Sequence, residues 1–273
     1  ADYLVISHAN FMTQAVQLAD YRAGRLSGQT PPQVLRSMAV DVQDIYDEFG
    51  YGTSGAEPIR AFLEYTYRSW QALPAPSYVV LMGDGHMDPK NYHNSRVNFI
   101  PPYLAPVDPW IGETAADNLY VTLSGEDNLP DMMLGRLPVN TTADAQVIVD
   151  KIINYEQNPN PGNWQQQVLT VADNADTAGD FAFYSESLHS CCLPAPYTPE
   201  KIYYGVNYSS VSETKTAIIN SLNSGKLLVN YNGHGDVAVW AHEQLFTILS
   251  IPSLTNAGML PVVVSMACRD GYY

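Results

Sequence analysis

The sequence predicts an α/β fold in which mostly parallel sheets are flanked by helices. Short apolar, β-branched runs alternate with segments of helical spacing, which is typical of β-α-β units. Apolar residues make up 46% of the 273 residues, enough to fill a sizeable core. The alternation stops at the turn-rich residues 158–163 and then begins again. We therefore expect two side-by-side subdomains, residues 1–160 and residues 161–273.

The first half is predicted to contain strands and helices in alternation. Residues 78–82 are the clearest buried strand, which Gly83-Asp84-Gly85 ends. Residues 58–70 have a proline near their start and apolar side chains at helical spacing, so they predict a helix. The prolines of residues 83–130 predict loops. The remaining predicted strands are residues 3–7, 38–42 and 132–138, and the remaining helices are residues 11–21 and 144–155.

The second half repeats this pattern. The predicted strands are residues 167–172, 201–205, 226–232 and 260–267, and the predicted helices are residues 180–189 and 213–223. Between the last two strands we expect a crossover helix, with residues 243–249 and 253–256 inside it. If those two strands are parallel neighbours, the residues that follow them emerge side by side at one edge of the sheet.

Composition excludes several classes of partner. The formal net charge is −15, and nucleic acids and anionic membranes both require a basic face. No run approaches the roughly 18 apolar residues of a transmembrane helix. Lysine is rare whereas Asn and Tyr are abundant, which favours a secreted or cell-surface protein. A removed signal peptide would explain why the chain starts at Ala1, and so would trimming.

Two residues at predicted strand ends are candidates for catalysis. His234 lies between two glycines directly after an apolar strand, and Cys268 directly follows the strand at residues 260–267. A thiol beside an imidazole is the usual arrangement for a cysteine nucleophile. Taken singly, each has an ordinary structural interpretation, as a histidine in a surface turn and a small buried cysteine. Taken as a pair at neighbouring strand ends, they favour catalysis.

Further motifs extend along the chain in a fixed order: residues 41–52, 78–89, 117–120, 131–138 and 151–156. Together with the Gly-His-Gly and Ala-Cys strand ends, they resemble the gingipain-type cysteine peptidases, which have a caspase-like fold. The resemblance covers nearly all of residues 1–273. It implies that the first subdomain is supportive and that the second carries the chemistry.

By this resemblance, Cys268 is the nucleophile and His234 protonates the leaving amine. The backbone N–H groups of Gly235 and Cys268 form the oxyanion hole. Asp173 occupies the place of an acid that orients the imidazole. Asp176 and Asp180 lie on the same loop, so any of the three acids could face His234.

Two sets of residues near the candidate catalytic pair are predicted to contact substrate. Asp176 and Asp180 are predicted to attract a basic P1 side chain, the side chain on the acyl side of the cleaved bond. Trp240, together with His242, is predicted to wall the active-site cleft, with ordinary packing as the alternative.

No cofactor is expected for catalysis, whereas the resemblance implies structural Ca²⁺. The sequence has no EF-hand spacing that would assign its ligands. The available carboxylates are Asp84, Asp88, Asp108, Glu113, Asp117, Glu126, Asp127, Asp131, Asp173, Asp176 and Asp180. A metal-dependent hydrolase built on Asp84, His86, Asp88 and His93 is a further alternative, without an HExxH or paired-cysteine pattern to support it.

The resemblance leaves the second subdomain incomplete, because relatives continue well beyond the position of Tyr273. Truncation, a deliberate fragment and cleavage after Tyr273 are three explanations. We expect a complementary C-terminal fragment of the same precursor to pack against this chain, since a strand as apolar as residues 260–267 belongs inside a sheet. The favoured function is a secreted cysteine endopeptidase that forms a thioester intermediate. The alternative is a catalytically silent surface or secretion-associated binding module.

Overall fold

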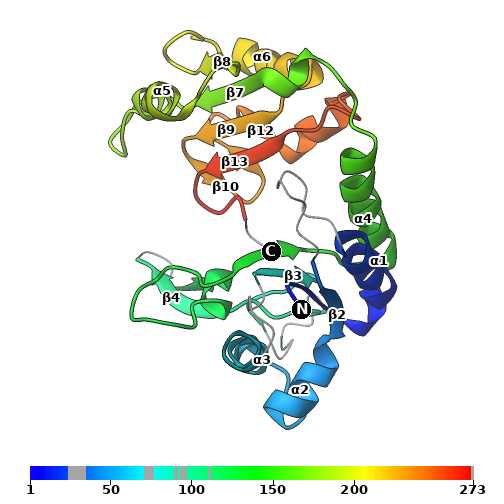
Figure 1. Ribbon diagram of the computed structural model, residues 1–273. Coiled ribbons are helices and arrows are strands. Elements are labelled where there is room, and N and C mark those ends of the chain that lie inside the picture. The colour runs from blue at the N-terminus through cyan, green and yellow to red at the C-terminus, as the bar shows by residue number, and fades with distance from the viewer. Residues whose placement is uncertain (24–34, 71–76, 89–91, 93–96, 110–111, 272–273) are drawn as a thin grey trace. The chain divides into compact units, whose positions relative to one another are not determined.

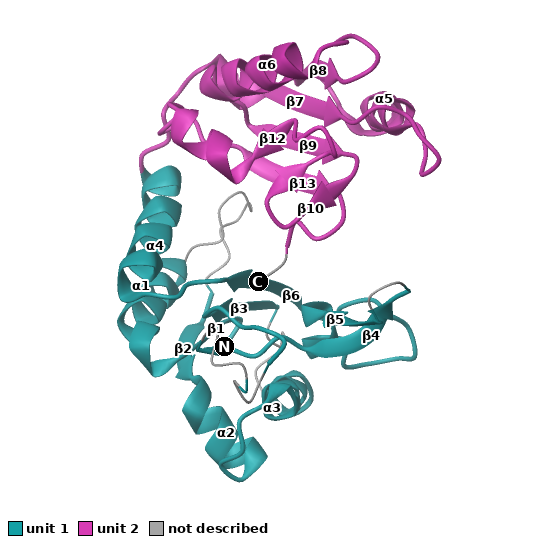
Figure 2. Ribbon diagram, turned by 180° about the vertical axis from the view of Figure 1, so that it is seen from behind, with its two compact units in different colours: residues 1–157, 273 teal, residues 158–272 magenta. Residues whose placement is uncertain are grey.

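The computed structural model describes residues 1–23, 35–70, 77–88, 92, 97–109 and 112–271 (Figure 1). The chain divides into two compact units, residues 1–157 and residues 158–272, whereas the sequence analysis placed the boundary after residue 160 (Figure 2). Each unit has its own parallel sheet with helices on its faces. The predicted α/β class is therefore confirmed.

The sheet of the first unit has four parallel strands in the order β2-β1-β3-β6. Their bounds are β1 Tyr3–Ser7, β2 Ser37–Asp41, β3 Tyr78–Met82 and β6 Met133–Leu137. All four were predicted to within two residues. The inner strands β1 and β3 are short apolar runs, and β1 is buried along its whole length.

Helices cover both faces of this sheet. Helices α1 (Met12–Arg22) and α4 (Thr142–Gln157) pack on the face of Val5, and helices α2 (Val42–Gly50) and α3 (Ala56–Ser69) pack on the face of Leu4. Helix α2 was not predicted, because the apolar Val42 was assigned to the preceding strand. Asp41 in fact ends β2, and its side chain accepts a hydrogen bond from Gln43 N–H as the N-cap of α2.

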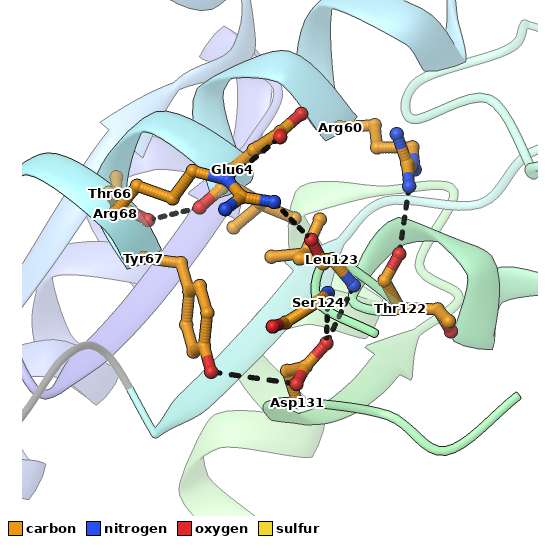
Figure 3. A network of polar contacts seen from close by, with 10 residues as sticks. Arg60, Glu64, Thr66, Tyr67, Arg68, Thr122, Leu123, Ser124 and Asp131 are labelled. Carbon is orange, nitrogen blue, oxygen red and sulfur yellow. Dashed lines mark hydrogen bonds and ion pairs between the residues drawn. The ribbon is translucent and has the colours of Figure 1, made fainter. Parts of the chain in front are cut away.

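The long connection from β3 to β6 contains a hairpin that the sequence analysis also missed. Its strands are β4 (Leu104–Asp108) and β5 (Gly112–Ala115). After it, Asp131 fixes the next loop by accepting hydrogen bonds from the N–H groups of Leu123 and Ser124, at 2.7 and 2.8 Å (Figure 3). Arg68 of α3 donates to the Leu123 carbonyl at 2.7 Å, so this loop is tied to the helix (Figure 3).

A buried ion pair holds the same connection to the sheet. The guanidinium of Arg136, on β6, pairs with Asp117 at 2.7 Å, and both side chains are largely buried, at 6% and 13% exposure. Arg136 also donates to the carbonyls of Gly83, Ile100 and Pro101. The ion pair and these hydrogen bonds offset the free-energy cost of burying the charged guanidinium.

The sheet of the second unit has four parallel strands in the order β13-β9-β7-β8. Their bounds are β7 Gln167–Ala172, β8 Thr198–Tyr203, β9 Leu228–Asn232 and β13 Val262–Met266. Helix α6 (Val211–Asn223) packs on the face of Leu169 and Val171. Helix α5 (Phe181–Cys192) contacts the other face, where His189 meets Thr170. At the end of α5, Cys191 and Cys192 form a disulfide.

The connection between β9 and β13 differs from the predicted crossover helix. It contains short antiparallel strands, β10 (Gly235–Asp236), β11 (Val239–Trp240) and β12 (Phe246–Thr247), followed by a 3-10 helix, Ile248–Ser253. Ala241 and Gln244 have positive φ angles, which break a helical path and turn the chain. The apolar periodicity of residues 243–249 therefore reflects turns that bury Leu245.

β13 lies at one edge of its sheet, with β9 as its neighbour in the described part of the chain. The sequence predicts that such an apolar strand belongs between two others and that this chain alone leaves it uncovered. Val262, Val263, Val264 and Met266 are exposed, at 59%, 51%, 41% and 61%.

Removing Asp117 should destabilise the first unit. We expect Asp117→Ala to lower the free energy of unfolding by about 3 kcal/mol or more, because Arg136 would keep a buried charge without its partner. The control is Asp20→Ala, at an exposed position on α1. We expect this substitution to change the free energy of unfolding by less than about 0.5 kcal/mol. Equal effects of the two substitutions in urea denaturation would contradict this role of the ion pair.

Candidate active site

Three strands of the second sheet end at the same level. In the parallel register, Asn232 of β9 is opposite both Ala172 of β7 and Met266 of β13. The residues that follow, Asp173, Gly233-His234 and Ala267-Cys268, therefore leave the sheet at one edge. The strands before His234 and Cys268 are thus parallel neighbours, as the catalytic prediction required.

Two glycines allow the loops at this edge to approach closely. A Cβ on Gly233 would lie 2.5 Å from the Cβ of Asp173. A Cβ on Gly235 would lie 2.6 Å from an oxygen of Asp270 and 2.8 Å from the Cys268 carbonyl oxygen. Such distances leave no room for a side chain, so Gly233 lets the His234 loop approach Asp173, and Gly235 lets it approach the turn that contains Cys268.

The backbone of His234 is fixed from several sides. Its carbonyl accepts hydrogen bonds from the Tyr231 hydroxyl at 2.5 Å and from Ala241 N–H at 2.7 Å. Its N–H donates to Asp173 Oδ2 at 3.3 Å. Burial, with the neighbouring Asp173 carboxylate, raises the pKa of Tyr231, so its hydroxyl stays protonated as a donor.

The imidazole of His234 contacts a different acid. Its Nε2 lies 2.8 Å from Asp176 Oδ2, and its ring packs edge-on against Phe181 at 5.3 Å between centroids. The ring of His242 lies 5.2 Å away. Of the three acids on the 173–180 loop, Asp176 is therefore the one whose carboxylate contacts the imidazole.

The other two acids have backbone partners. Asp173 accepts hydrogen bonds from the N–H groups of Asn174 and His234, and burial raises its pKa despite them. Asp180 is the N-cap of α5, where Oδ1 accepts from Phe183 N–H at 2.9 Å. The pKa of Asp176 is lowered, first by the hydrogen bond from Ala178 N–H and then by the His234 side chain.

Cys268 is an exposed free thiol at the start of a tight turn. The next residue, Arg269, has a φ of 61°, and its guanidinium pairs with Asp236 at 3.1 Å. Asp270 folds back and accepts a hydrogen bond from the Ser265 hydroxyl. These contacts were not predicted from the sequence. The sequence does contain a signal for the ion pair, because Asp236 closely follows His234 and the oppositely charged Arg269 directly follows Cys268.

Trp240 is held mainly by packing. Its ring stacks on Tyr231, with 4.4 Å between centroids and 7° between ring planes, and it also meets Phe246 at 5.2 Å. This matches the ordinary packing alternative of the sequence analysis, and a contact between Trp240 and substrate stays a prediction.

No group of three or more His, Cys, Asp or Glu side chains suited to a metal ion occurs among the described residues. Several acids proposed for Ca²⁺ have other partners: Asp84 accepts from Asn140, Asp117 pairs with Arg136, and Asp176 contacts His234. The described residues therefore assign no ligand set to Ca²⁺, and structural Ca²⁺ stays a prediction. Of the alternative metal set, His93 lies outside the described residues. Across the described ranges, no helix is long and apolar enough to span a membrane.

Comparison with known proteins identifies relatives along the whole chain. The model of peptidase family C25 matches residues 1–273. Gingipain R2 of Porphyromonas gingivalis is 28% identical over 201 residues, which cover 71% of this chain and 24% of that protein. Lys-gingipain W83 of the same organism is 24% identical over 229 residues, covering 81% of this chain and 12% of that protein.

Solved structures agree with this assignment. The crystal structure of the Arg-specific cysteine proteinase gingipain R has a TM-score of 0.72 and 25% identity, covering 98% of this chain and 55% of that chain. The complex of Porphyromonas gingivalis RgpB pro- and mature domains has a TM-score of 0.72 and 24% identity, covering 99% of this chain and 56% of that chain. The predicted gingipain-type, caspase-like fold is confirmed. This chain spans about half the length of those structures and a quarter of gingipain R2.

A methyl group at Gly235 should disturb the site. We expect Gly235→Ala to lower the free energy of unfolding by roughly 1–3 kcal/mol, because its Cβ would collide with the 267–270 turn. Gly135→Ala is the matched control, since nothing lies within 4 Å of its added Cβ. If urea denaturation shows equal effects for the two substitutions, the close packing at Gly235 is wrong.

The pKa values of Asp176 and Asp173, the two acids that contact His234, should be shifted in opposite directions. In a ¹³C NMR titration we expect the Asp176 carboxyl below, and the Asp173 carboxyl above, the usual pKa of aspartate. The contribution of Asp176 to stability is then fully present above the usual value and lost as the pH falls through its lowered pKa. The contribution of Asp173 favours the folded state at low pH and is lost as the pH rises through its raised pKa. The reverse order would contradict the assigned environments.

Proposed function

The chain belongs to peptidase family C25, and on that basis we propose that it is a cysteine endopeptidase that uses a Cys268–His234 dyad. One observation supports this above all: the two residues directly follow neighbouring parallel strands at the same level of the sheet. The exposed thiol and the tight packing of both loops at Gly235 also support it. A cysteine nucleophile needs an accessible sulfur and an imidazole within reach of it, and we propose that Cys268 and His234 fill these two roles.

In the proposed reaction, the Cys268 thiol gives its proton to His234, and the sulfur attacks the carbonyl carbon of the scissile peptide bond. The carbonyl oxygen becomes an oxyanion that accepts hydrogen bonds from the N–H groups of Gly235 and Cys268. The C–N bond then breaks as His234 protonates the leaving amine, and a thioester remains. Water, deprotonated by His234, hydrolyses the thioester and restores the thiol.

We assign the orientation of the imidazole to Asp176. Its Oδ2 contacts Nε2, which leaves Nδ1 as the nitrogen that exchanges protons with thiol, amine and water. The carboxylate is preorganised, because Asp176 and Gly179 exchange backbone hydrogen bonds and Ala178 N–H donates to Oδ1 at 2.7 Å. Asp173 acts on the backbone of His234 instead, through the N–H of that residue.

The proposed substrates are peptides or proteins with a basic P1 side chain. The solved relative is an Arg-specific proteinase and another relative is a Lys-gingipain. In this chain, Asp176 and Asp180 flank the α5 end of the site, and Asp180 keeps one carboxylate oxygen beyond its capping bond. A cationic side chain suits such a surface, particularly in a protein with a net charge of −15.

We also propose that the protein acts outside the cytoplasm and associates with another fragment of its precursor. One relative is known as a complex of pro- and mature domains. β13 is an edge strand with exposed apolar side chains, and such a fragment would pair with its backbone edge and cover part of them. Structural Ca²⁺ rests on the family resemblance alone and has no ligand set among the described residues.

A covalent probe tests the dyad. We expect a peptidyl acyloxymethyl ketone to add once to the native protein, on Cys268, because only an activated thiolate displaces the acyloxy group rapidly. Intact mass spectrometry measures the adduct and reveals any associated fragment. His234→Ala should lose the adduct. A native protein that remains unmodified would contradict the peptidase and favour the silent binding module.

Substitution of the three acids tests their assigned roles. We expect Asp176→Asn to lower kcat by roughly 10- to 100-fold and to alter its pH profile, because the imidazole loses its charged partner. Asp180→Asn keeps the helix cap and should raise KM for basic substrates with a smaller effect on kcat. A larger loss of kcat in Asp173→Asn than in Asp176→Asn would overturn the assignment.

A further inference from the structure

We propose that the first unit contains a separate binding site for a small organic cation, with an ammonium or guanidinium group. The site is a cavity of about 330 Å³ at the carboxyl ends of β1 and β2. His8 and Ala9 line it after β1, and Asp41 and Gln43 line it after β2. All its lining residues belong to residues 1–157, whereas His234 and Cys268 belong to the other unit.

The position of the cavity follows from the topology of the sheet. β1 and β2 are adjacent parallel strands, yet the chain leaves them toward opposite faces. After β1 it enters α1, which packs with the face of Val5, and after β2 it enters α2, which packs with the face of Leu4. The loops diverge at such a point and open a crevice, which is where open α/β sheets bind ligands. Figure 1 shows α2 directly following β2 at this edge.

The chemistry of the lining favours a cation. Asp41 is its one acidic residue, and the lining contains no lysine or arginine among the described residues. Asp41 Oδ1 accepts from Gln43 N–H, and its charge has no ion-pair partner in the described part of the chain. Tyr46 and Phe99 also line the cavity, and both are largely buried, at 6% and 7% exposure. A carboxylate in a cavity without a competing cation binds amines and guanidinium groups through charge-assisted hydrogen bonds.

An anion would be a poor occupant, although two helices begin at this cavity. The start of α2 is already capped by Asp41. The start of α3 has Glu57 beside it, with a carboxylate oxygen 3.3 Å from where a Gly55 Cβ would lie. An anionic ligand would therefore face the Asp41 carboxylate in the lining, with the Glu57 carboxylate close to the second helix start.

Calorimetric titration of the full chain tests the site, with ethylguanidinium and butylammonium as cationic probes and propionate as the anionic probe. The informative variant is Asp41→Asn, because asparagine caps a helix as well as aspartate does but carries no charge. The matched control is Asp44→Asn, which removes the same charge from an exposed position of α2.

We expect a cationic probe to bind wild type and Asp44→Asn equally, and Asp41→Asn about tenfold more weakly. NMR should show the ring signals of His8 and Tyr46 shifting in the same titration. Three outcomes would overturn the proposal: no cation binding to wild type, equal binding to both variants, or binding of propionate in preference to the cations. Prior alkylation of Cys268 should leave the result unchanged, which separates this site from the proposed peptidase.

Discussion

The parallel register of β7, β9 and β13 is the constraint on which the second unit depends. It places Asp173, His234 and Cys268 at one edge of the sheet, although they are far apart in the sequence. Glycine at positions 233 and 235 then lets the loops approach to distances that no other residue tolerates. Positive φ angles at Ala241, Gln244 and Arg269 surround the same loops, and strain of this kind concentrates at functional sites.

Two acids three residues apart have opposite properties because their surroundings differ. Asp173 is buried directly after β7, so desolvation raises its pKa and its oxygens are occupied by backbone N–H groups. Asp176 lies in an exposed turn whose N–H groups favour the charged form, and its free oxygen reaches His234. An orienting role requires a stable negative charge at the ring, which Asp176 supplies better than Asp173.

Much of the fold could be predicted because buried parallel strands have a strong local signal. The runs at β3 and β7 are short, apolar and bounded by turn residues, so their bounds were correct. Helix α2 was missed because Val42 continues the apolar strand, whereas the cap that starts the helix is a side-chain hydrogen bond of Asp41. The choice among Asp173, Asp176 and Asp180 depends on the path of one turn, which spacing along the chain cannot supply. The Arg269–Asp236 pair depends likewise on tertiary contact between two loops.

The most direct measurement is a crystal structure of the native protein with a peptidyl aldehyde bound. An aldehyde adds the thiol reversibly and mimics the tetrahedral intermediate. We expect a bond from Cys268 Sγ to the aldehyde carbon, with the new oxygen near the N–H groups of Gly235 and Cys268. His234 should face the adduct while its Nε2 keeps the contact with Asp176. An adduct whose oxygen lies away from Gly235, or an imidazole turned away from Cys268, would contradict the proposed dyad.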